Sequence, residues 1–316
     1  MLCARHPCGP PIDSVALRLL GAIAATLVLL CGLTAAVAAR PFVIGSISTA
    51  PGAETKLYYP LAAFLGRNLG EFGFDGGKVS VARDIPGLIS LFDAGLIDLY
   101  IDSPYPLLAV SQATGTKVIL RRWEHGKPDY RSIIVVRKES DIRNKAGLNG
   151  RVIAFVSDFS TSGYLLPKLA LQAVGLSLTA YHEGINHPIG PRASGYVFSR
   201  DEENTLVWIL RGRVDAGAIG THEFEHYRPA ERDQLRIIYQ SPLFPRQLVS
   251  VHKGAPVDLI ARIRRLLIDL EHTDAGRKLL ADLNGTTRFD DIPADVETSL
   301  GPIRAHIARA VPVNKR

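Results

Sequence analysis

Cysteine is the most informative scarcity in this chain. The 316 residues include three cysteines, all within the first 31 positions, so the remainder can form neither a disulfide nor a thiolate metal site. The excess of positive over negative charge is also small. A formal net charge of +6 does not indicate a particular class of partner. The sequence has no internal repeat, low-complexity tract, basic helix, zinc finger or aromatic-interleaved sheet pattern. We therefore expect no nucleic-acid partner.

A long uncharged hydrophobic run occurs only near the N-terminus. It extends from Leu19 to Ala39, follows two arginines and ends in small residues. A basic start, an apolar core and an Ala-x-Ala end are typical of a cleaved secretory signal. We predict a signal peptide over residues 1–39, cleaved near Ala38 and Ala39, and a periplasmic location. A retained membrane anchor is the alternative, because the run is about long enough to span a bilayer.

Strand and helix patterns alternate through the rest of the chain. Apolar and β-branched runs predict strands at 42–45, 79–81, 97–101, 132–137, 152–156, 216–219, 235–239 and 248–251. Apolar residues at helical spacing predict helices at 57–69, 86–93, 107–112, 163–174, 205–210, 259–270 and 296–310. This alternation predicts an α/β fold, with two α/β lobes of mixed, mostly parallel sheets.

Two crossovers are expected to join these lobes. We place them near residues 122–131 and 236–247. The first lobe would then be discontinuous, with residues 40–125 and 240–316. The second lobe would comprise residues 126–239.

A run of hydroxyl residues follows the strand predicted at 152–156. Ser160, Thr161 and Ser162 precede Gly163 at the start of a predicted helix. The first turn of a helix has unpaired N–H groups and the positive end of the helix dipole, so this segment suits an anion. An ordinary N-cap is the alternative, although one hydroxyl would suffice for it. The segment has no nucleophile–base pair, which indicates binding and not catalysis.

This segment also carries a resemblance to a known family. Residues 160–167, Ser-Thr-Ser-Gly-Tyr-Leu-Leu-Pro, resemble the signature of phosphonate/phosphate-type substrate-binding proteins of ABC importers. Residues 44–49, 58–65, 129–138 and 212–218 are similar to other segments of that family, in the right order. The resemblance implies a type II periplasmic binding-protein fold and binding of a phosphonate, phosphate or phosphite.

The resemblance also implies roles for particular residues. In that family the Ser-Thr-Ser hydroxyls and the following amides hold the oxyanion, which nominates Ser160 to Gly163. The loop after the first strand lines the cleft, which nominates Ser48 and Thr49; a plain turn is the alternative.

The chain departs from the family pattern where it has Ile85, Asp102 and Glu202. Carboxylates of Asp102 and Glu202 in the cleft would suit a zwitterion such as an aminoalkylphosphonate, because they can pair with an ammonium group. The alternative for Glu202 is a solvated first helical turn.

These features together predict a binding protein that is not an enzyme and needs no cofactor. It would capture a small oxyanion in a cleft between the lobes and deliver it to an ABC permease in the inner membrane. A sensor subunit that presents the ligand to a signalling receptor has the same expected fold and is the alternative.

A second motif predicts a different function. His222, Glu223 and His226 match the H-E-x-x-H pattern of zinc hydrolases. Pro229 should end a helix soon after this match, and no glycine-spaced third histidine follows. We therefore keep a zinc-dependent hydrolase only as a remote alternative, and expect no metal.

Overall fold

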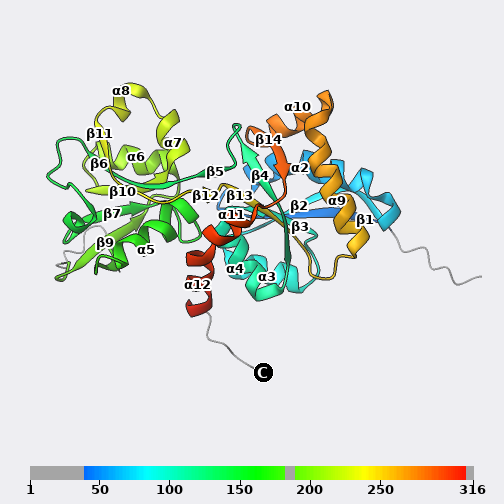
Figure 1. Ribbon diagram of the computed structural model, residues 1–316, viewed down its shortest axis with the longest axis horizontal. Coiled ribbons are helices and arrows are strands. Elements are labelled where there is room, and N and C mark those ends of the chain that lie inside the picture. Colours follow the sequence, from blue (N-terminus) through cyan, green and yellow to red (C-terminus); the bar gives the residue numbers. More distant parts are fainter. Residues whose placement is uncertain (1–38, 182–188, 311–316) are drawn as a thin grey trace, which may run out of the picture. The chain divides into compact units, whose positions relative to one another are not determined.

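Two six-stranded sheets organise the protein (Figure 1). The computed structural model describes residues 39–181 and 189–310. The predicted signal peptide, apart from Ala39, lies outside these residues. Within the described part of the chain, no helix combines the length and the apolarity needed to cross a bilayer.

The first sheet is centred on strands that are buried on both faces. In β1 (Arg40–Ile47) every residue from Phe42 to Ile47 is buried, a pattern typical of a strand covered by helices on both sides. Its strand order is β14-β4-β13-β3-β1-β2. Strands β1, β2 (Phe74–Ala82) and β3 (Leu99–Asp102) pair in parallel. Strands β13 (Gln247–Val251), β4 (Lys117–Glu124) and β14 (Thr286–Asp290) add antiparallel pairs.

The second sheet repeats this plan, with strand order β11-β6-β10-β7-β9-β8. Parallel pairs join β10 (Ala216–Gly220), β7 (Val152–Phe155), β9 (Ala193–Phe198) and β8 (Ser177–Ala180). Antiparallel pairs add β6 (Ser132–Arg137) and β11 (Leu235–Gln240). Two short strands lie where the chain passes between the sheets, and β5 (Asp129–Tyr130) pairs there with β12 (Phe244–Pro245).

Helices cover both faces of each sheet. On the first sheet, α2 (Pro51–Asn68) and α9 (Val257–Asp269) share one apolar cluster, and α3 (Ile85–Asp93) and α4 (Pro104–Thr114) share the other. On the second sheet, α6 (Glu202–Leu210) covers one face and α5 (Leu166–Gln172) the other. Gly66 lets α2 approach β2 closely, because a Cβ there would lie 1.6 Å from the Gly76 carbonyl oxygen.

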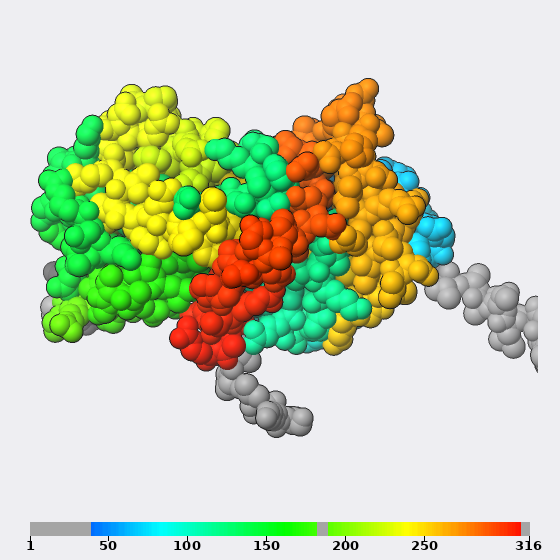
Figure 2. Space-filling model, in the orientation of Figure 1, coloured from blue at the N-terminus to red at the C-terminus, as the bar shows by residue number. Residues whose placement is uncertain are grey.

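The C-terminal part of the described chain returns to the first sheet. It contains α10 (Asp274–Asp282), α11 (Ala294–Ser299) and α12 (Gly301–Ala310). Ile303 and Ile307 of α12 are buried in the cluster that α3 and α4 share. Figure 2 shows α11 and α12, in red, on the surface between the green-to-yellow residues of the second sheet and the orange residues that include α10.

The predicted mixed α/β fold class and its two crossovers are confirmed, whereas the division into lobes at the stated boundaries stays a prediction. The helix predicted at 296–310 is broken at Leu300 into α11 and α12, because Pro302 has no N–H to continue the first helix. Strands β4, β8, β9 and β14 were not predicted. In β4 and β14, charged residues within the strand interrupt the apolar pattern. Asp290 ends β14 and pairs with Arg121 at 2.8 Å.

Candidate ligand-binding site

A cavity of about 300 Å³ lies where residues from both sheets meet. Most of its lining is polar. The first-sheet part of the chain and the crossovers contribute Ile47, Ser48, Thr49, Glu54, Asp102, Ser103, Glu124, Tyr130, Arg246 and Gln247. The second-sheet part contributes Val156, Ser157, Phe159, Ser160, Ser162, Arg200, Glu202 and Glu223.

The cavity lies at the carboxyl ends of parallel strands. Strand β1 ends at Ile47, β3 ends at Asp102 and β7 ends at Phe155, and the residues that follow each strand line the cavity. A helix begins soon after each strand, so helix N-termini also gather there. Ligand sites in open α/β sheets are found at this position. The sheet topology therefore places the polar loops that the sequence singled out beside one another.

The Ser-Thr-Ser segment opens a continuous helix. A π-helical turn, η3 (Thr161–Leu165), leads directly into α5. The Ser160 hydroxyl accepts a hydrogen bond of 2.9 Å from the Gly163 N–H, so Ser160 is an N-cap as well as a cavity residue. Gly163 is required here by packing, because a Cβ would lie 2.4 Å from Val156 Cγ2.

The three hydroxyls of this segment have different surroundings. The Thr161 hydroxyl donates to Ser103 Oγ and accepts from the Tyr105 N–H, each at 2.9 Å. Thr161 thus ties the start of η3 to the start of α4. Ser160 and Ser162 line the cavity, whereas Thr161 and Gly163 support it without being part of the lining.

The other four predicted site residues also line the cavity. Ser48 and Thr49 follow β1, Asp102 ends β3, and Glu202 begins α6. Glu202 is half-buried at the first turn of α6, with its side chain at the cavity, so its role in ligand binding stays a prediction. Ile85, the third departure from the family pattern, lies elsewhere, in a neighbouring cavity with Tyr105 and His306.

Two of these carboxyl groups have raised pKa values. Burial raises the pKa of Asp102 from 3.8 to about 6, although hydrogen bonds from the Tyr100 hydroxyl (2.7 Å) and the Ser103 N–H (2.6 Å) oppose the rise. Burial raises the pKa of Glu202 from 4.5 to about 7, and the nearby Glu223 carboxylate adds to the rise. Both carboxyl groups therefore keep their protons to a higher pH than exposed carboxyl groups do, and a nearby cationic group would favour their ionised forms.

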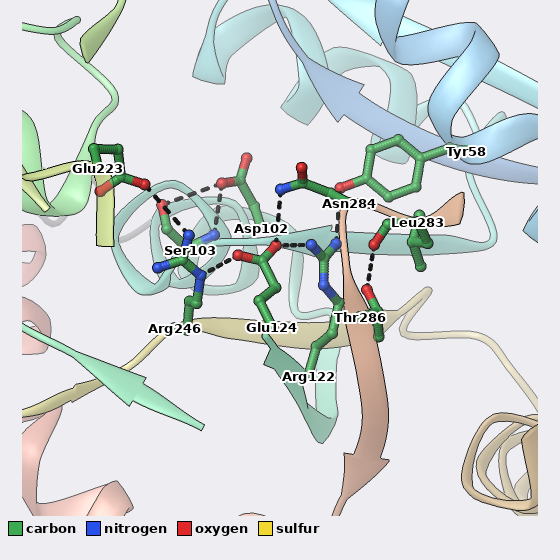
Figure 3. A network of polar contacts seen from close by, with 10 residues as sticks. All are labelled: Tyr58, Asp102, Ser103, Arg122, Glu124, Glu223, Arg246, Leu283, Asn284 and Thr286. Carbon is green, nitrogen blue, oxygen red and sulfur yellow. Dashed lines mark hydrogen bonds and ion pairs between the residues drawn. The ribbon is translucent and has the colours of Figure 1, made fainter. Parts of the chain in front are cut away.

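A chain of alternating charges forms one wall of the cavity (Figure 3). Glu124 lies between two arginines and pairs with both Arg122 and Arg246. The side chains of Arg122 and Glu124 are each only 1% exposed. Arg246 also contacts Glu223 across the cavity, with Nη2 to Oε1 at 3.3 Å. The pairing fixes Arg246 at the cavity surface, because leaving any of these charges unpaired would be costly.

Sequence reasoning missed most of this charged wall. Glu54, Glu124, Arg200 and Arg246 lie in segments that carry no recognisable motif, and only the fold brings them together. Glu223 was noticed only as part of the H-E-x-x-H motif.

The H-E-x-x-H motif does not form a metal site in this structure. Its helix α7 (Thr221–His226) has one and a half turns and ends at His226, as Pro229 predicts. Glu223 is turned to Arg246, and the rings of His222 and His226 lie with centroids 4.1 Å apart and planes inclined by 36°. Among the described residues, no group of three or more His, Cys, Asp or Glu side chains could hold a metal ion.

Comparison with known proteins identifies the family. Residues 44–296 match the model of the phosphonate-type periplasmic substrate-binding proteins of ABC transporters. The chain belongs to this family. The predicted resemblance is thereby confirmed over most of the chain.

Two curated proteins of related sequence match about half of this chain. The phosphate-import protein PhnD of Mycolicibacterium smegmatis is 28% identical over 149 residues, which are 45% of this chain and 44% of that protein. A probable phosphite-binding protein of an ABC transporter, PhnD1 of Prochlorococcus marinus, is 24% identical over 178 residues, 51% of this chain and 55% of that protein. The chain therefore spans only about half the length of these relatives in the aligned regions.

Solved structures share the fold over a larger part of the chain. XAC2383 from Xanthomonas citri, bound to chloride, covers 85% of this chain and 97% of its own at a TM-score of 0.79 and 23% identity. PhnD1 of P. marinus in complex with methylphosphonate covers 85% and 98% at a TM-score of 0.62 and 16% identity. Both show a type II periplasmic binding-protein fold, as the sequence predicts.

Proposed function

We propose that this protein is the periplasmic substrate-binding component of an ABC importer and captures a small phosphonate in its polar cavity. The observation that carries the proposal is the cavity itself, where hydroxyls at the ends of β1 and β7 face a wall of paired charges. The relatives named for phosphate and phosphite, and the neighbour that binds methylphosphonate, support the same ligand class.

The oxyanion would bind at the start of η3. Ser160 and Ser162 line the cavity with their hydroxyls at a helix N-terminus, which favours negative charge. Ser48 and Thr49 line the cavity from the loop after β1. Arg246 adds a fixed positive charge to the same lining, although Glu124 and Glu223 offset part of it.

The remainder of the cavity favours a cation. Glu54, Asp102, Glu202 and Glu223 all contribute carboxyl groups to the lining. A bare phosphate would meet these groups at an electrostatic cost, whereas an ammonium group on the ligand would pair with them. We therefore infer a zwitterionic ligand of the aminoalkylphosphonate class, with its phosphonate at Ser160 and its ammonium near Asp102 and Glu202.

Calorimetric titration of the purified protein at pH 7.5 tests this function. The ligands are 2-aminoethylphosphonate, methylphosphonate, inorganic phosphate and 2-aminoethanesulfonate. We expect 2-aminoethylphosphonate to bind at least about tenfold more tightly than methylphosphonate, the effect of one charge-assisted contact of about 1.4 kcal/mol. Binding of all four ligands no tighter than millimolar would overturn the proposal.

Two variants locate the binding site. The double variant Ser160→Ala with Ser162→Ala should weaken 2-aminoethylphosphonate binding by more than about tenfold, because two donors to the oxyanion are lost. Ser177→Ala is the matched control, since Ser177 is exposed in β8 and lies outside the cavity lining. Equal affinity in the double variant and the control would place the oxyanion elsewhere.

A further inference from the structure

Three histidines from two distant segments meet beside the cavity. His125 lies in the turn between β4 and β5, and His222 and His226 lie on α7. The rings of His125 and His222 stack with centroids 4.4 Å apart and planes inclined by 10°. The His226 ring lies 4.1 Å from His222 and 6.1 Å from His125. Two imidazolium ions at this distance would repel each other, so the stacked arrangement favours uncharged rings.

This histidine cluster belongs to a larger contact between the β4–β5 turn and α7. Lys127 on the turn pairs with Glu225 on α7 at 2.8 Å. Deeper in the protein, Arg246 joins Glu124 at the end of β4 to Glu223 on α7. Two of the histidines are sequence neighbours of residues that line the cavity: His125 follows Glu124, and His222 precedes Glu223. The cluster therefore connects the turn after β4, a strand of the first sheet, to α7, which follows β10 of the second sheet.

The charges around the cluster disfavour protonation. The cations that face it are Arg122, Lys127, Arg228 and Arg246. The carboxylates that face it are Glu124, Glu202, Glu203, Glu223 and Glu225. All of these carboxylates except Glu202 are engaged by a cation: Glu124 and Glu223 by Arg246, Glu225 by Lys127 and Glu203 by Arg228. These pairings reduce the stabilisation that the four carboxylates can give an imidazolium, although Glu223 still favours protonation of His125.

We propose that His125, His222 and His226 form a proton-sensitive contact that holds the β4–β5 turn against α7, so that acid loosens the two sheets and weakens ligand capture. This proposal rests on the proposed function, because it assumes that ligand binding favours the arrangement of the sheets seen here. Neutral rings stack and keep the contact; protonated rings repel each other and the nearby arginines.

The pKa directions agree with this mechanism. Burial, Arg246 and His226 lower the pKa of His125, and burial, Arg246 and the other two histidines lower the pKa of His222 from 6.5 to about 4. If the contact opens, these imidazoles return to the ordinary pKa of about 6.5. Protons are then taken up on opening, so the contact is complete above about pH 6.5 and is lost as the pH falls below it.

The expected effect on affinity follows from this linkage. One imidazole that must stay neutral weakens binding at pH 5.5 by at most about tenfold relative to pH 7.5. His222 is half-buried, whereas His125 and His226 are exposed, so solvent screening reduces the effect to about three- to tenfold. Asp102 and Glu202 titrate in the same range, so the histidine contribution is the difference between the wild type and a histidine variant.

The first measurement is the affinity for 2-aminoethylphosphonate at pH 7.5 and pH 5.5 in the wild type, His222→Gln and His272→Gln. For each protein, the ratio of Kd at pH 5.5 to Kd at pH 7.5 measures the loss of affinity on acidification. We expect this ratio to be about three- to tenfold smaller in His222→Gln than in the wild type. His272→Gln is the control, since this exposed histidine lies in η4 (Leu270–His272) and should leave the wild-type pH response unchanged. Identical pH responses in all three proteins would overturn the proposal.

The second measurement needs no ligand. Histidine ring resonances are titrated by NMR in the free protein, with His222→Gln used for assignment and a blocked histidine peptide as reference. A His222 midpoint at least one pH unit below the peptide supports the contact, and a midpoint equal to that of the peptide overturns it. If no phosphonate binds the wild type, the proposed function fails, and this titration still decides whether the histidine contact exists.

Discussion

Neutralising Glu202 should stabilise the ligand-free protein while weakening ligand binding. The fold raises the pKa of this carboxyl group from 4.5 to about 7, so it favours the protonated form. A group with a raised pKa contributes its full stability below its unfolded pKa, near 4.5, and loses that stability as the pH rises through about 7. At pH 8 the wild-type protein therefore carries a buried negative charge that glutamine would remove.

The shift sets the size of the effect. The rise in the pKa of Glu202 corresponds to at most about 3 kcal/mol in the free energy of unfolding. Glu202 lines a cavity that water enters, and solvent screening reduces the expected gain for Glu202→Gln at pH 8 to about 1–2 kcal/mol. Below pH 4.5 the glutamate of the wild type is protonated and, like the glutamine of the variant, uncharged. The stability gained by Glu202→Gln should therefore vanish there.

Urea unfolding of the wild type and variants, followed by tryptophan fluorescence at pH 4.5, 6 and 8, measures this effect. Glu203→Gln is the matched control, because Glu203 is the next residue of α6 and its exposed side chain pairs with Arg228 at 3.2 Å; its change should stay within about 0.5 kcal/mol. A Glu202→Gln variant no more stable than the wild type at pH 8, or equally stabilised at pH 4.5, would refute the reasoning.

Three further substitutions test the supports of the cavity by the same unfolding measurement. Glu124→Gln should destabilise the protein by about 3–5 kcal/mol, because it leaves the buried Arg122 without its carboxylate partner, whereas Glu297→Gln, at an exposed residue, should change stability by less than about 0.5 kcal/mol; equal effects would contradict the role of the buried network. Gly163→Ala should cost about 1–3 kcal/mol, because its Cβ would overlap Val156, and no loss would mean that the β7–η3 junction is looser than it appears in the structure. Thr161→Val keeps the side-chain shape but removes the hydrogen bonds to α4, so a loss of about 1–2 kcal/mol is expected, and an unchanged midpoint would show that these bonds are unimportant.

The central strands could be predicted from the sequence because burial on both faces leaves a clear pattern. The predicted strand at 132–137 coincides with β6, and β7 begins at the predicted residue 152. Strands β4 and β14 escaped prediction because their arginines and carboxylates pair with each other, so they do not follow an apolar pattern.

The oxyanion side of the site was more predictable than the rest. Ser160 and Ser162 lie in one contiguous motif whose chemistry depends on a local helix start. The charged wall could not be predicted in this way, since Glu124 and Arg246 are 122 residues apart in sequence and meet only through the pairing of β4 with β13.

A crystal structure of the protein grown with 2-aminoethylphosphonate tests the central claim most directly. We predict the phosphonate oxygens against Ser160, Ser162 and the loop of Ser48 and Thr49, and the ammonium group against Asp102 and Glu202. A ligand bound outside this cavity, or bound with its phosphonate against the carboxylates and its ammonium at the start of η3, would contradict the proposed function.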